Sequence, residues 1–247
     1  MNKAMILAAG FGTRLKPWTD SHPKALVPVG GIPMLKRVIN KLISQGFDEI
    51  VINTHHFSDQ VKNYLHNEKF DAVIKISDES DKILDTGGGV LKASEKFSPG
   101  GSILIHNVDI LSDAPLNDIL NMHEQSGRDV TLVTSRRVSS RKLIFDHRGN
   151  LKGWHNLKSG EYRPARFLPD PSYDESAFSG IYVVNENALK HLKKYSDEID
   201  KKDFPVMDFF LANLNKIKIG EIKLQKLNLI DIGKPDTLRQ ADAMFNG

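Results

Sequence analysis

Residues 4–17 read AMILAAGFGTRLKP. Residues 4–9 carry no charge and no polar alternation, which is typical of a parallel strand covered on both faces. Gly10 and Gly12 then allow a sharp turn that can bring backbone N–H groups close to an anion, and Arg14 adds a planar cation suited to phosphate. The stretch therefore predicts a buried strand that ends in a phosphate-binding loop.

Two better-known glycine-rich loops fit these residues less well. The phosphate loop of NTPases needs Lys followed by Ser or Thr after its last glycine, whereas Thr13 and Arg14 follow Gly12 here. The dinucleotide fingerprint needs a third small residue where this chain has Leu15, and no clear acidic strand end follows about 20 residues later. The first interpretation fails and the second is weak.

Strands and helices alternate after the loop. A helix that begins near Pro33 has apolar residues at three- and four-residue spacing and ends at Gly46, and an apolar strand follows at 49–54. Such βαβ order predicts an α/β fold with a mostly parallel sheet and helices on its faces. Further predicted strands are 72–77, 102–108, 130–134 and 176–184. Further predicted helices are 58–65 (capped by Ser58), 91–96, 116–125, 185–195 (capped by Asn185), 205–214 and a terminal helix to about Phe245.

Composition and charge narrow the class of protein. The 247 residues are 40% hydrophobic and 26% charged, which are ordinary globular values, and no stretch approaches about 18 consecutive apolar residues. We therefore expect a cytoplasmic protein with no membrane partner. A net charge of +3 with scattered lysines argues against a nucleic-acid partner, and Arg136-Arg137 and Arg141-Lys142 are interpreted as solvated loop faces. The absence of cysteine excludes disulfides and thiolate catalysis.

The opening motif matches a known family. Residues 7–17 and Pro23-Lys24 agree, position by position, with the pattern Leu-Ala-Ala-Gly-x-Gly-Thr-Arg-Leu-x-Pro and the following Pro-Lys of the sugar-nucleotide pyrophosphorylases. The chain thus resembles this branch of the glycosyltransferase-A-type nucleotidyltransferases. The resemblance implies a Rossmann-like, mixed, mostly parallel sheet with helices on both faces. It also implies transfer of a nucleotidyl group from an NTP to a sugar 1-phosphate.

Later motifs extend the resemblance over nearly the whole chain. Residues 85–89 (DTGGG) place three glycines at a predicted helix entrance, where open backbone amides and the helix dipole favour an anionic ligand. Asp109 ends a buried strand, at the edge of an α/β sheet where ligands bind. Residues 178–181 (FSGI) resemble the family's segment that closes over the sugar, and residues 231–235 (DIGKP) resemble its closing motif.

The resemblance assigns roles to individual residues. Arg14 would bind the leaving pyrophosphate, Lys24 would bind near the α-phosphate, and Asp109 and Asp231 would hold catalytic Mg²⁺. The nucleotide would contact Leu7, Ala8, Ala9, Gly10, Gly12, Thr13, Arg14, Asp85, Gly87, Gly88 and Asn107, and the sugar would contact Gly88, Gly89, Ser179 and Gly180. The chain lacks the Glu-Lys-Pro segment whose lysine binds the sugar phosphate in many relatives. The candidates to replace that lysine are Arg141, Lys142, Lys158, Arg163 and Arg166.

The substrates and the division of the chain are less specific. We expect one domain over 1–247, with a nucleotide-binding part at about 1–135, a sugar-binding part at about 136–228 that includes a β-hairpin at 143–154, and a closing strand and helix at 229–247. The form of residues 85–89 is most similar to N-acetylmuramate-1-phosphate uridylyltransferases and mannose-1-phosphate guanylyltransferase-like chains, and UTP is the preferred donor. Alternatives are a guanylyltransferase, a phosphocholine-type cytidylyltransferase and a non-catalytic sugar-nucleotide sensor. A monomer or small homo-oligomer is expected.

Overall fold

The structure, a computed structural model, describes residues 1–246. Its strands are β1 (Asn2–Leu7), β2 (Pro28–Val29), β3 (Ile32–Pro33), β4 (Phe47–Thr54), β5 (Val73–Asp78), β6 (Ile103–Asn107), β7 (Ile110–Ser112), β8 (Val130–Ser135), β9 (Arg141–Phe145), β10 (Leu151–Asn156), β11 (Glu161–Arg163), β12 (Asp174–Val184), β13 (Ile219–Leu224) and β14 (Leu229–Asp231). Its α-helices are α1 (Met34–Ser44), α2 (Ser58–Asn67), α3 (Asp85–Ser94), α4 (Leu116–Ser126), α5 (Glu186–Glu198), α6 (Val206–Ala212) and α7 (Pro235–Asn246). Short 3-10 turns cover η1 (Thr13–Leu15), η2 (Trp18–Asp20) and η3 (Lys24–Leu26).

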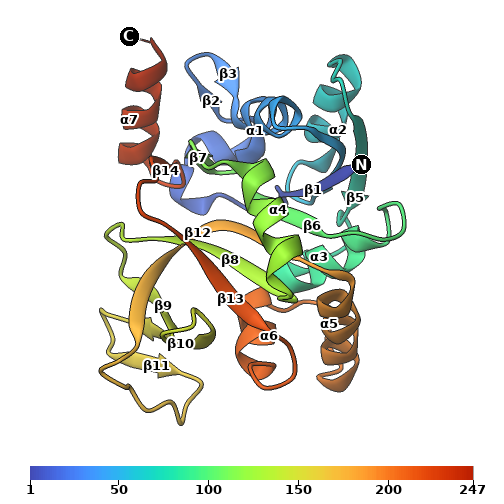
Figure 1. Ribbon diagram of the computed structural model, residues 1–247. Helices are drawn as coiled ribbons and strands as arrows, with labels where there is room; N and C mark the ends of the chain where they lie inside the picture. Colours follow the sequence, from blue (N-terminus) through green and yellow to red (C-terminus); the bar gives the residue numbers. More distant parts are fainter. Residues whose placement is uncertain (247) are drawn as a thin grey trace.

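A mixed sheet runs through the molecule, as expected from the sequence (Figure 1). Strands β5, β4, β1 and β6 are parallel neighbours, β12 is antiparallel to both β6 and β8, and β13 is parallel to β8. The register pairs Leu7 with both Asn53 and Asn107. These three residues therefore lie at one level of the sheet's carboxyl edge, where ligands bind in open α/β sheets.

Alternation along the central strands fills two hydrophobic cores, one on each face of the sheet. Ile6 packs with α1, α2 and α4 on one face, whereas its neighbour Met5 packs with α3, α5 and α6 on the other. Both side chains are fully buried. Because successive side chains on a strand point to opposite faces, a strand with no polar alternation requires cover on both sides. The expectation of helices on both faces is thus confirmed.

The predicted hairpin is present and belongs to a small sheet. β9 and β10 are antiparallel, and β11, which the sequence did not predict, adds a third strand beside β10. The long strand β12 connects this sheet to the main one, since Asp174–Ser176 pair with β9 whereas its later residues pair with β8 and β6. Figure 1 shows the small sheet at the lower end of the molecule and α7 at the upper end.

The start of one helix and the cap of another differ from the prediction. Helix α3 begins at Asp85 rather than near Leu91, so the three glycines lie inside the helix. Ser58 does not cap α2, because its Oγ bonds to Thr54 Oγ1 at 2.8 Å and donates to Asp78 Oδ1 at 3.0 Å. The predicted cap at Asn185 is confirmed, since its side chain accepts from the backbone N of Ala188.

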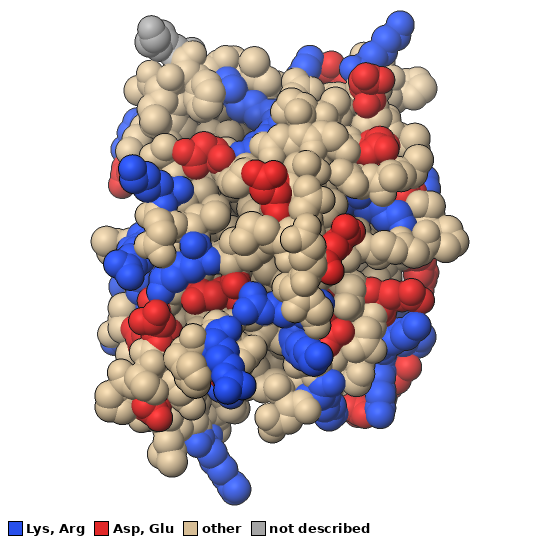
Figure 2. Space-filling model, viewed as in Figure 1, with Lys and Arg blue, Asp and Glu red and all other residues tan. Residues whose placement is uncertain are grey.

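Surface charge and hydropathy agree with the composition. Figure 2 shows Lys and Arg interspersed with Asp and Glu over the visible face rather than gathered in one basic stripe. Within residues 1–246, no helix is both long enough and apolar enough to cross a membrane.

Candidate active site

The glycine-rich loop after β1 is held by the neighbouring strand and open on one side. The Ala8 N–H donates to Asn53 Oδ1 at 2.7 Å, which fixes the start of the loop. Gly12 has a positive φ of 64°, and a Cβ on it would lie 2.9 Å from Lys24 Cβ, so a side chain would be strained and crowded there. A Cβ on Gly10 would meet no atom within 4 Å. The loop is therefore fixed beneath and free to receive a ligand above Gly10.

Lys24 and Asp109 form a half-buried ion pair at the carboxyl edge of the sheet. Lys24 begins η3, and its Nζ donates to Asp109 Oδ2. The two side chains are 12% and 15% exposed. Charged groups in such a site interact more strongly than on the open surface, because less water screens them. The pair places a cation and an anion directly beside the glycine-rich loop.

Asp231 reaches the same place through a two-stranded ribbon. β14 is antiparallel to β7, with Asp231 opposite Ile110, and the Ile232 N–H donates to the Asp109 backbone oxygen at 3.0 Å. The sequence places Asp231 at the end of a strand, but that strand lies in the ribbon and outside the main sheet. The ribbon nonetheless brings Asp109 and Asp231 together from positions more than a hundred residues apart.

Three of the predicted catalytic side chains surround Gly233. A Cβ built on this glycine would lie 2.7 Å from Arg14 Nη2, 2.8 Å from Asp231 Oδ1 and 3.3 Å from Lys24 Nζ. Since Lys24 also pairs with Asp109, the structure gathers all four residues into one group. We call Arg14, Lys24, Asp109 and Asp231 the catalytic cluster, after the role that the sequence predicts for them.

Two adjoining cavities open beside the catalytic cluster. The first has a volume of about 190 Å³ and is lined by Leu7, Ala8, Ala9, Gly10, Lys24, Asn53, Ile83, Asp85, Thr86, Asn107, Val108 and Asp109. The second, of about 940 Å³, extends over β9, β10 and β12 and includes Arg14, Ser179, Gly180 and Asp231 in its wall. The cavities share Leu7, Thr86, Asn107 and Asp109. A ligand with two parts can therefore occupy both and cross Asp109.

Some of the predicted ligand contacts line these two cavities and others do not. Leu7, Ala8, Ala9, Gly10, Asp85 and Asn107 line the first cavity, and Arg14, Ser179 and Gly180 line the second. Gly12, Thr13, Gly87, Gly88 and Gly89 line neither.

The expectation that the α3 glycines present open amides is wrong for Gly87, whose N–H donates to Phe204 O at 2.8 Å. A Cβ on Gly88 would lie 1.8 Å from the Lys202 backbone oxygen, and one on Gly89 would lie 2.9 Å from Asn53 Nδ2. These glycines let α3 pack closely against neighbouring backbone and side chains.

The basic candidates in the second half of the chain are also sorted by the structure. Arg141, Lys142 and Lys158 line the larger cavity, whereas Arg163 forms an ion pair with Asp208 at 2.7 Å. Neither Arg163 nor Arg166 lines it. Arg137 does line it, which corrects its interpretation as part of a solvated loop face. Burial lowers the pKa of Arg137, and the nearby charge of Asp231 partly opposes that effect.

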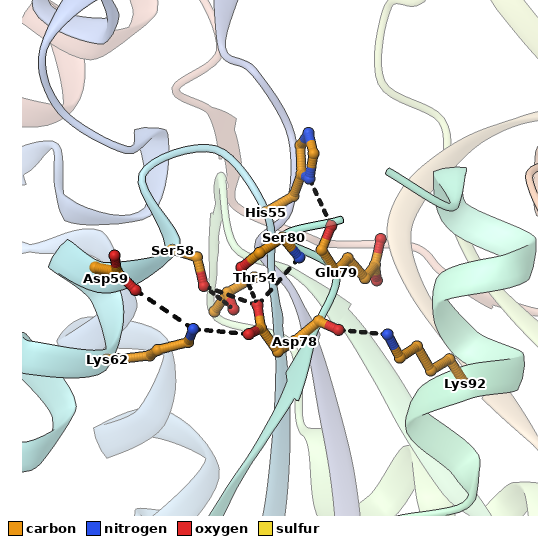
Figure 3. Close-up of polar contacts among 9 residues, drawn as sticks. All are labelled: Thr54, His55, Ser58, Asp59, Lys62, Asp78, Glu79, Ser80 and Lys92. Carbon is orange, nitrogen blue, oxygen red and sulfur yellow. Dashed lines mark hydrogen bonds and ion pairs between the residues drawn. The ribbon is translucent and has the colours of Figure 1, made fainter. Parts of the chain in front are cut away.

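A second group of acidic residues lies at the carboxyl end of β5 and is held by several hydrogen bonds within the protein (Figure 3). Asp78 accepts hydrogen bonds from Lys62, Ser80 and Ser58, and Lys92 donates to its backbone oxygen. Burial alone would raise the pKa of Asp78, but these hydrogen bonds outweigh it and hold the pKa well below its usual range. We call the group around Asp78 and the adjacent Glu79 the β5 cluster.

Glu79 links the β5 cluster to the glycine-rich loop. Its carboxylate is 1% exposed and accepts from Asn53 Nδ2 at 2.7 Å and from the Leu84 N–H at 3.0 Å. Asn53 in turn accepts from the Ala8 N–H. A chain of hydrogen bonds therefore joins the start of the loop to the residue that precedes α3. Sequence reasoning missed both Asn53 and Glu79.

The histidines near the site contact backbone oxygens or lie buried in the sheet. His55 Nδ1 is 2.7 Å from the Glu79 backbone oxygen, and His56 Nε2 is 3.1 Å from the Thr19 oxygen. His106 is completely buried in β6, where burial lowers its pKa to about 4. It is therefore uncharged at neutral pH.

The catalytic cluster also fits a magnesium ion. Among residues 1–246, no three His, Asp or Glu side chains converge as a ready-made metal cage. Mg²⁺ commonly needs only one or two carboxylates, because water and substrate phosphates complete its coordination. The carboxylates of Asp109 and Asp231 are of the right type, and they face the junction of the two cavities.

The sequence of the chain is similar to one protein family and to several curated proteins. The profile of the family described as "Nucleotidyl transferase" matches residues 3–246. Mannose-1-phosphate guanyltransferase from Hypocrea jecorina is 29% identical over 98% of the chain, and mannose-1-phosphate guanylyltransferase 1 from Arabidopsis thaliana is 28% identical over 82%. The matches cover 64% and 55% of those relatives, so the chain spans little more than half of their length.

A solved structure shares the fold. A Bacillus anthracis protein, described as a candidate glucose-1-phosphate thymidylyltransferase in complex with a sucrose, superposes over 100% of this chain and 96% of its own, with a TM-score of 0.79 and 19% identity. At that identity the likeness concerns the fold alone.

Proposed function

Because the chain belongs to the nucleotidyl transferase family, we propose that it transfers a nucleotidyl group from an NTP to a sugar 1-phosphate, giving an NDP-sugar and pyrophosphate. The observation that carries this proposal is the catalytic cluster at the junction of the two cavities. The smaller cavity beside the glycine-rich loop would hold the nucleotide. The larger cavity under the small sheet would hold the sugar phosphate.

The reaction needs charge neutralisation more than it needs a base. An oxygen of the sugar phosphate attacks the α-phosphorus, and the bond from that phosphorus to the bridging oxygen breaks as pyrophosphate leaves. The attacking group is already an anion, so no side chain must remove a proton. Positively charged donors that surround the phosphates would bring the anions together and stabilise the charge on the leaving oxygen. Arg14 and Lys24, whose Nη2 and Nζ atoms both lie near Gly233, would be these donors.

Asp109 and Asp231 would hold Mg²⁺ against the same phosphates. When bound, the ion supplies Lewis-acid neutralisation of phosphate oxygens. The carboxylates of this chain would position it, and the Lys24–Asp109 pair keeps one of them oriented beside the loop. Asp231 Oδ1 accepts from the Gly233 N–H at 2.8 Å, which fixes the other.

The names of the curated relatives favour GTP and mannose 1-phosphate as substrates. They lend no support to the UTP preference that the sequence suggested. Ala8, Ala9 and Gly10 in the first cavity's wall have no polar side-chain atom, and we propose the base preference from the relatives rather than from a side chain. We thus place the GTP and mannose 1-phosphate pair first and treat the other donors as competitors.

A substrate panel tests this function. Pyrophosphate release would be measured with GTP, UTP, CTP and dTTP, each against mannose 1-phosphate, glucose 1-phosphate, N-acetylmuramate 1-phosphate and phosphocholine, with Mg²⁺ and with excess EDTA. We expect turnover with a sugar 1-phosphate, fastest with GTP and mannose 1-phosphate, and its loss in EDTA. Turnover with CTP and phosphocholine alone would show that the acceptor is the phosphate of an alcohol and not a sugar 1-phosphate. Nucleotide-sugar binding with no turnover for any pair would favour a sensor instead.

A further inference from the structure

Arg137 occupies a distinct position in the wall of the larger cavity. It follows the carboxyl end of β8, which points to the same edge of the sheet as β6. Its Nη2 donates to the Phe178 backbone oxygen at 2.7 Å, and its own backbone oxygen accepts from Lys142 Nζ at 3.0 Å. The guanidinium is therefore anchored beside β12 and does not move freely like a surface side chain.

The guanidinium has an unused donor. Arg137 Nε is buried and makes no hydrogen bond within residues 1–246, and no carboxylate in that range forms an ion pair with the side chain. A buried donor of a charged group without a partner is costly. Native structures seldom keep one unless a ligand or solvent completes it. Arg137 lines the larger cavity, so an anion bound there would balance the charge of its side chain.

Other basic side chains near this wall are engaged or exposed. Lys24 is paired with Asp109, and Lys142 donates to the Arg137 backbone. Arg141 and the neighbouring Arg136 are exposed. Arg137 thus combines an anchored position, partial burial and a charge that pairs with no carboxylate of residues 1–246.

We propose that Arg137 binds the phosphate of the sugar 1-phosphate and orients it toward the α-phosphorus of the NTP. The inference rests on the proposed function and deepens it by naming a substrate-binding residue. Asp231, whose charge acts on Arg137, also lies beside Arg14 and Lys24 at Gly233. The acceptor phosphate would thus be held by Arg137, and the NTP phosphates by Arg14 and Lys24.

Steady-state kinetics of Arg137→Gln and Arg137→Lys would test the assignment, with exposed Arg136→Gln as the matched control. We expect Arg137→Gln to raise the KM for the sugar 1-phosphate about 10- to 100-fold, the range typical of a lost hydrogen bond to a charged group. The KM for the NTP should change less than about twofold. Arg137→Lys should fall between, because lysine keeps the charge but cannot reproduce the guanidinium geometry. Arg136→Gln should behave like the unmodified protein.

Binding measurements separate this inference from the reaction itself. Isothermal titration of mannose 1-phosphate, with no NTP present, should show weaker binding to Arg137→Gln than to the unmodified protein and to Arg136→Gln. If the unmodified protein turns over no substrate pair, the proposed function fails, and the same titration with mannose 1-phosphate and inorganic phosphate still decides whether Arg137 binds phosphate. Unchanged acceptor KM and affinity in a folded Arg137→Gln would overturn the proposal, as would a larger rise in the KM for the NTP. Should Arg137→Gln fail to fold, Arg137→Lys decides by the same criteria.

Discussion

The β5 cluster and the catalytic cluster both contain two carboxylates near the carboxyl edge of the main sheet. They differ in how many protein groups contact those carboxylates. In the β5 cluster, Asp78 accepts hydrogen bonds from Lys62, Ser58 and Ser80 (Figure 3). The Glu79 carboxylate accepts from Asn53 and from the Leu84 N–H. In the catalytic cluster, Asp109 and Asp231 have fewer protein partners and face two cavities. One edge of the molecule thus holds a group of carboxylates that stabilises the fold and a group that faces the cavities.

The difference shows how a structural carboxylate can be told from a functional one. Buried polar groups are satisfied within the protein when their role is to fix the fold. Groups that must bind a ligand keep unused hydrogen-bonding or metal-coordinating positions toward a cavity. The stability lost by leaving them unpaired is offset elsewhere in the protein. By this criterion, changes in the catalytic cluster should alter turnover, and changes in the β5 cluster should alter stability.

The largest expected effect is on turnover in Asp109→Asn and Asp231→Asn. Each change keeps the size of the side chain and a hydrogen-bond acceptor but removes a carboxylate charge. We predict that kcat falls by at least about 100-fold in each variant, the scale of single electrostatic contacts in catalysis. The measurement is pyrophosphate release at saturating substrates, with thermal unfolding to show that each variant is folded.

The double variant sharpens that prediction. If both aspartates serve one ion, Asp109→Asn combined with Asp231→Asn should cost much less than the product of the single losses, because groups that act as a unit are not additive. Asp78→Asn, in the β5 cluster, is the control and should retain nearly full kcat. Multiplicative losses, or near-normal turnover in either single variant, would show that the two carboxylates do not act together.

The sequence predicted the catalytic cluster better than its surroundings. Local motifs carry the glycine-rich loop, Lys24 and Asp109, because those residues depend on short-range backbone geometry and on the end of one strand. Asn53 and Glu79 were missed because their importance arises from the register of β1, β4 and β5, which brings them to the loop. That register is a property of the folded sheet.

Arg137 and the glycines of α3 were misread for related reasons. A basic pair after a strand is usually solvated, and only the packing of β12 against β8 anchors Arg137 over the cavity. The rule that ligands bind beyond the carboxyl ends of strands would have singled it out, since β8 ends at Ser135. The glycines look like an open anion site in sequence, but the segment ending at Phe204 covers Gly87 and Gly88, and Asn53 and Glu79 lie against Gly89.

We expect an intermediate effect, on stability and on NTP binding, from Glu79→Gln in the β5 cluster. The substitution places an amide where the carboxylate accepts from Asn53 and the Leu84 N–H, so at least one buried donor loses its acceptor. We predict a loss of about 1–3 kcal/mol in the free energy of unfolding. The KM for the NTP should rise because Asn53 holds the start of the loop. Urea unfolding measures the first effect and initial-rate kinetics the second.

Exposed Glu124→Gln is the matched control for Glu79→Gln and should change neither quantity. Unaltered stability in Glu79→Gln would contradict a supporting role for the buried carboxylate. A large fall in kcat with normal stability would place Glu79 with the catalytic cluster and would break the comparison between the two.

The smallest effect, and the one with a distinctive pH dependence, is expected for Asp78→Asn. The folded protein holds the pKa of Asp78 below its ordinary value of 3.8, so ionised Asp78 stabilises the fold above about that pH. The stabilisation is lost as the pH falls through the lower folded-state value, because the unfolded chain takes up the proton first. The side chain is 43% exposed and screened by water, so we predict a difference of only about 1 kcal/mol at pH 7. Urea unfolding should show this difference constant from pH 7 to about pH 5, smaller below pH 4 and reduced in 1 M salt.

Asp59→Asn is the control, because Asp59 contacts the same Lys62 at 3.4 Å but is 91% exposed, and its effect should be near zero. A difference that grows toward acidic pH would mean that Asp78 is protonated in the fold, and the β5 cluster would then not be the satisfied charge network that the comparison requires.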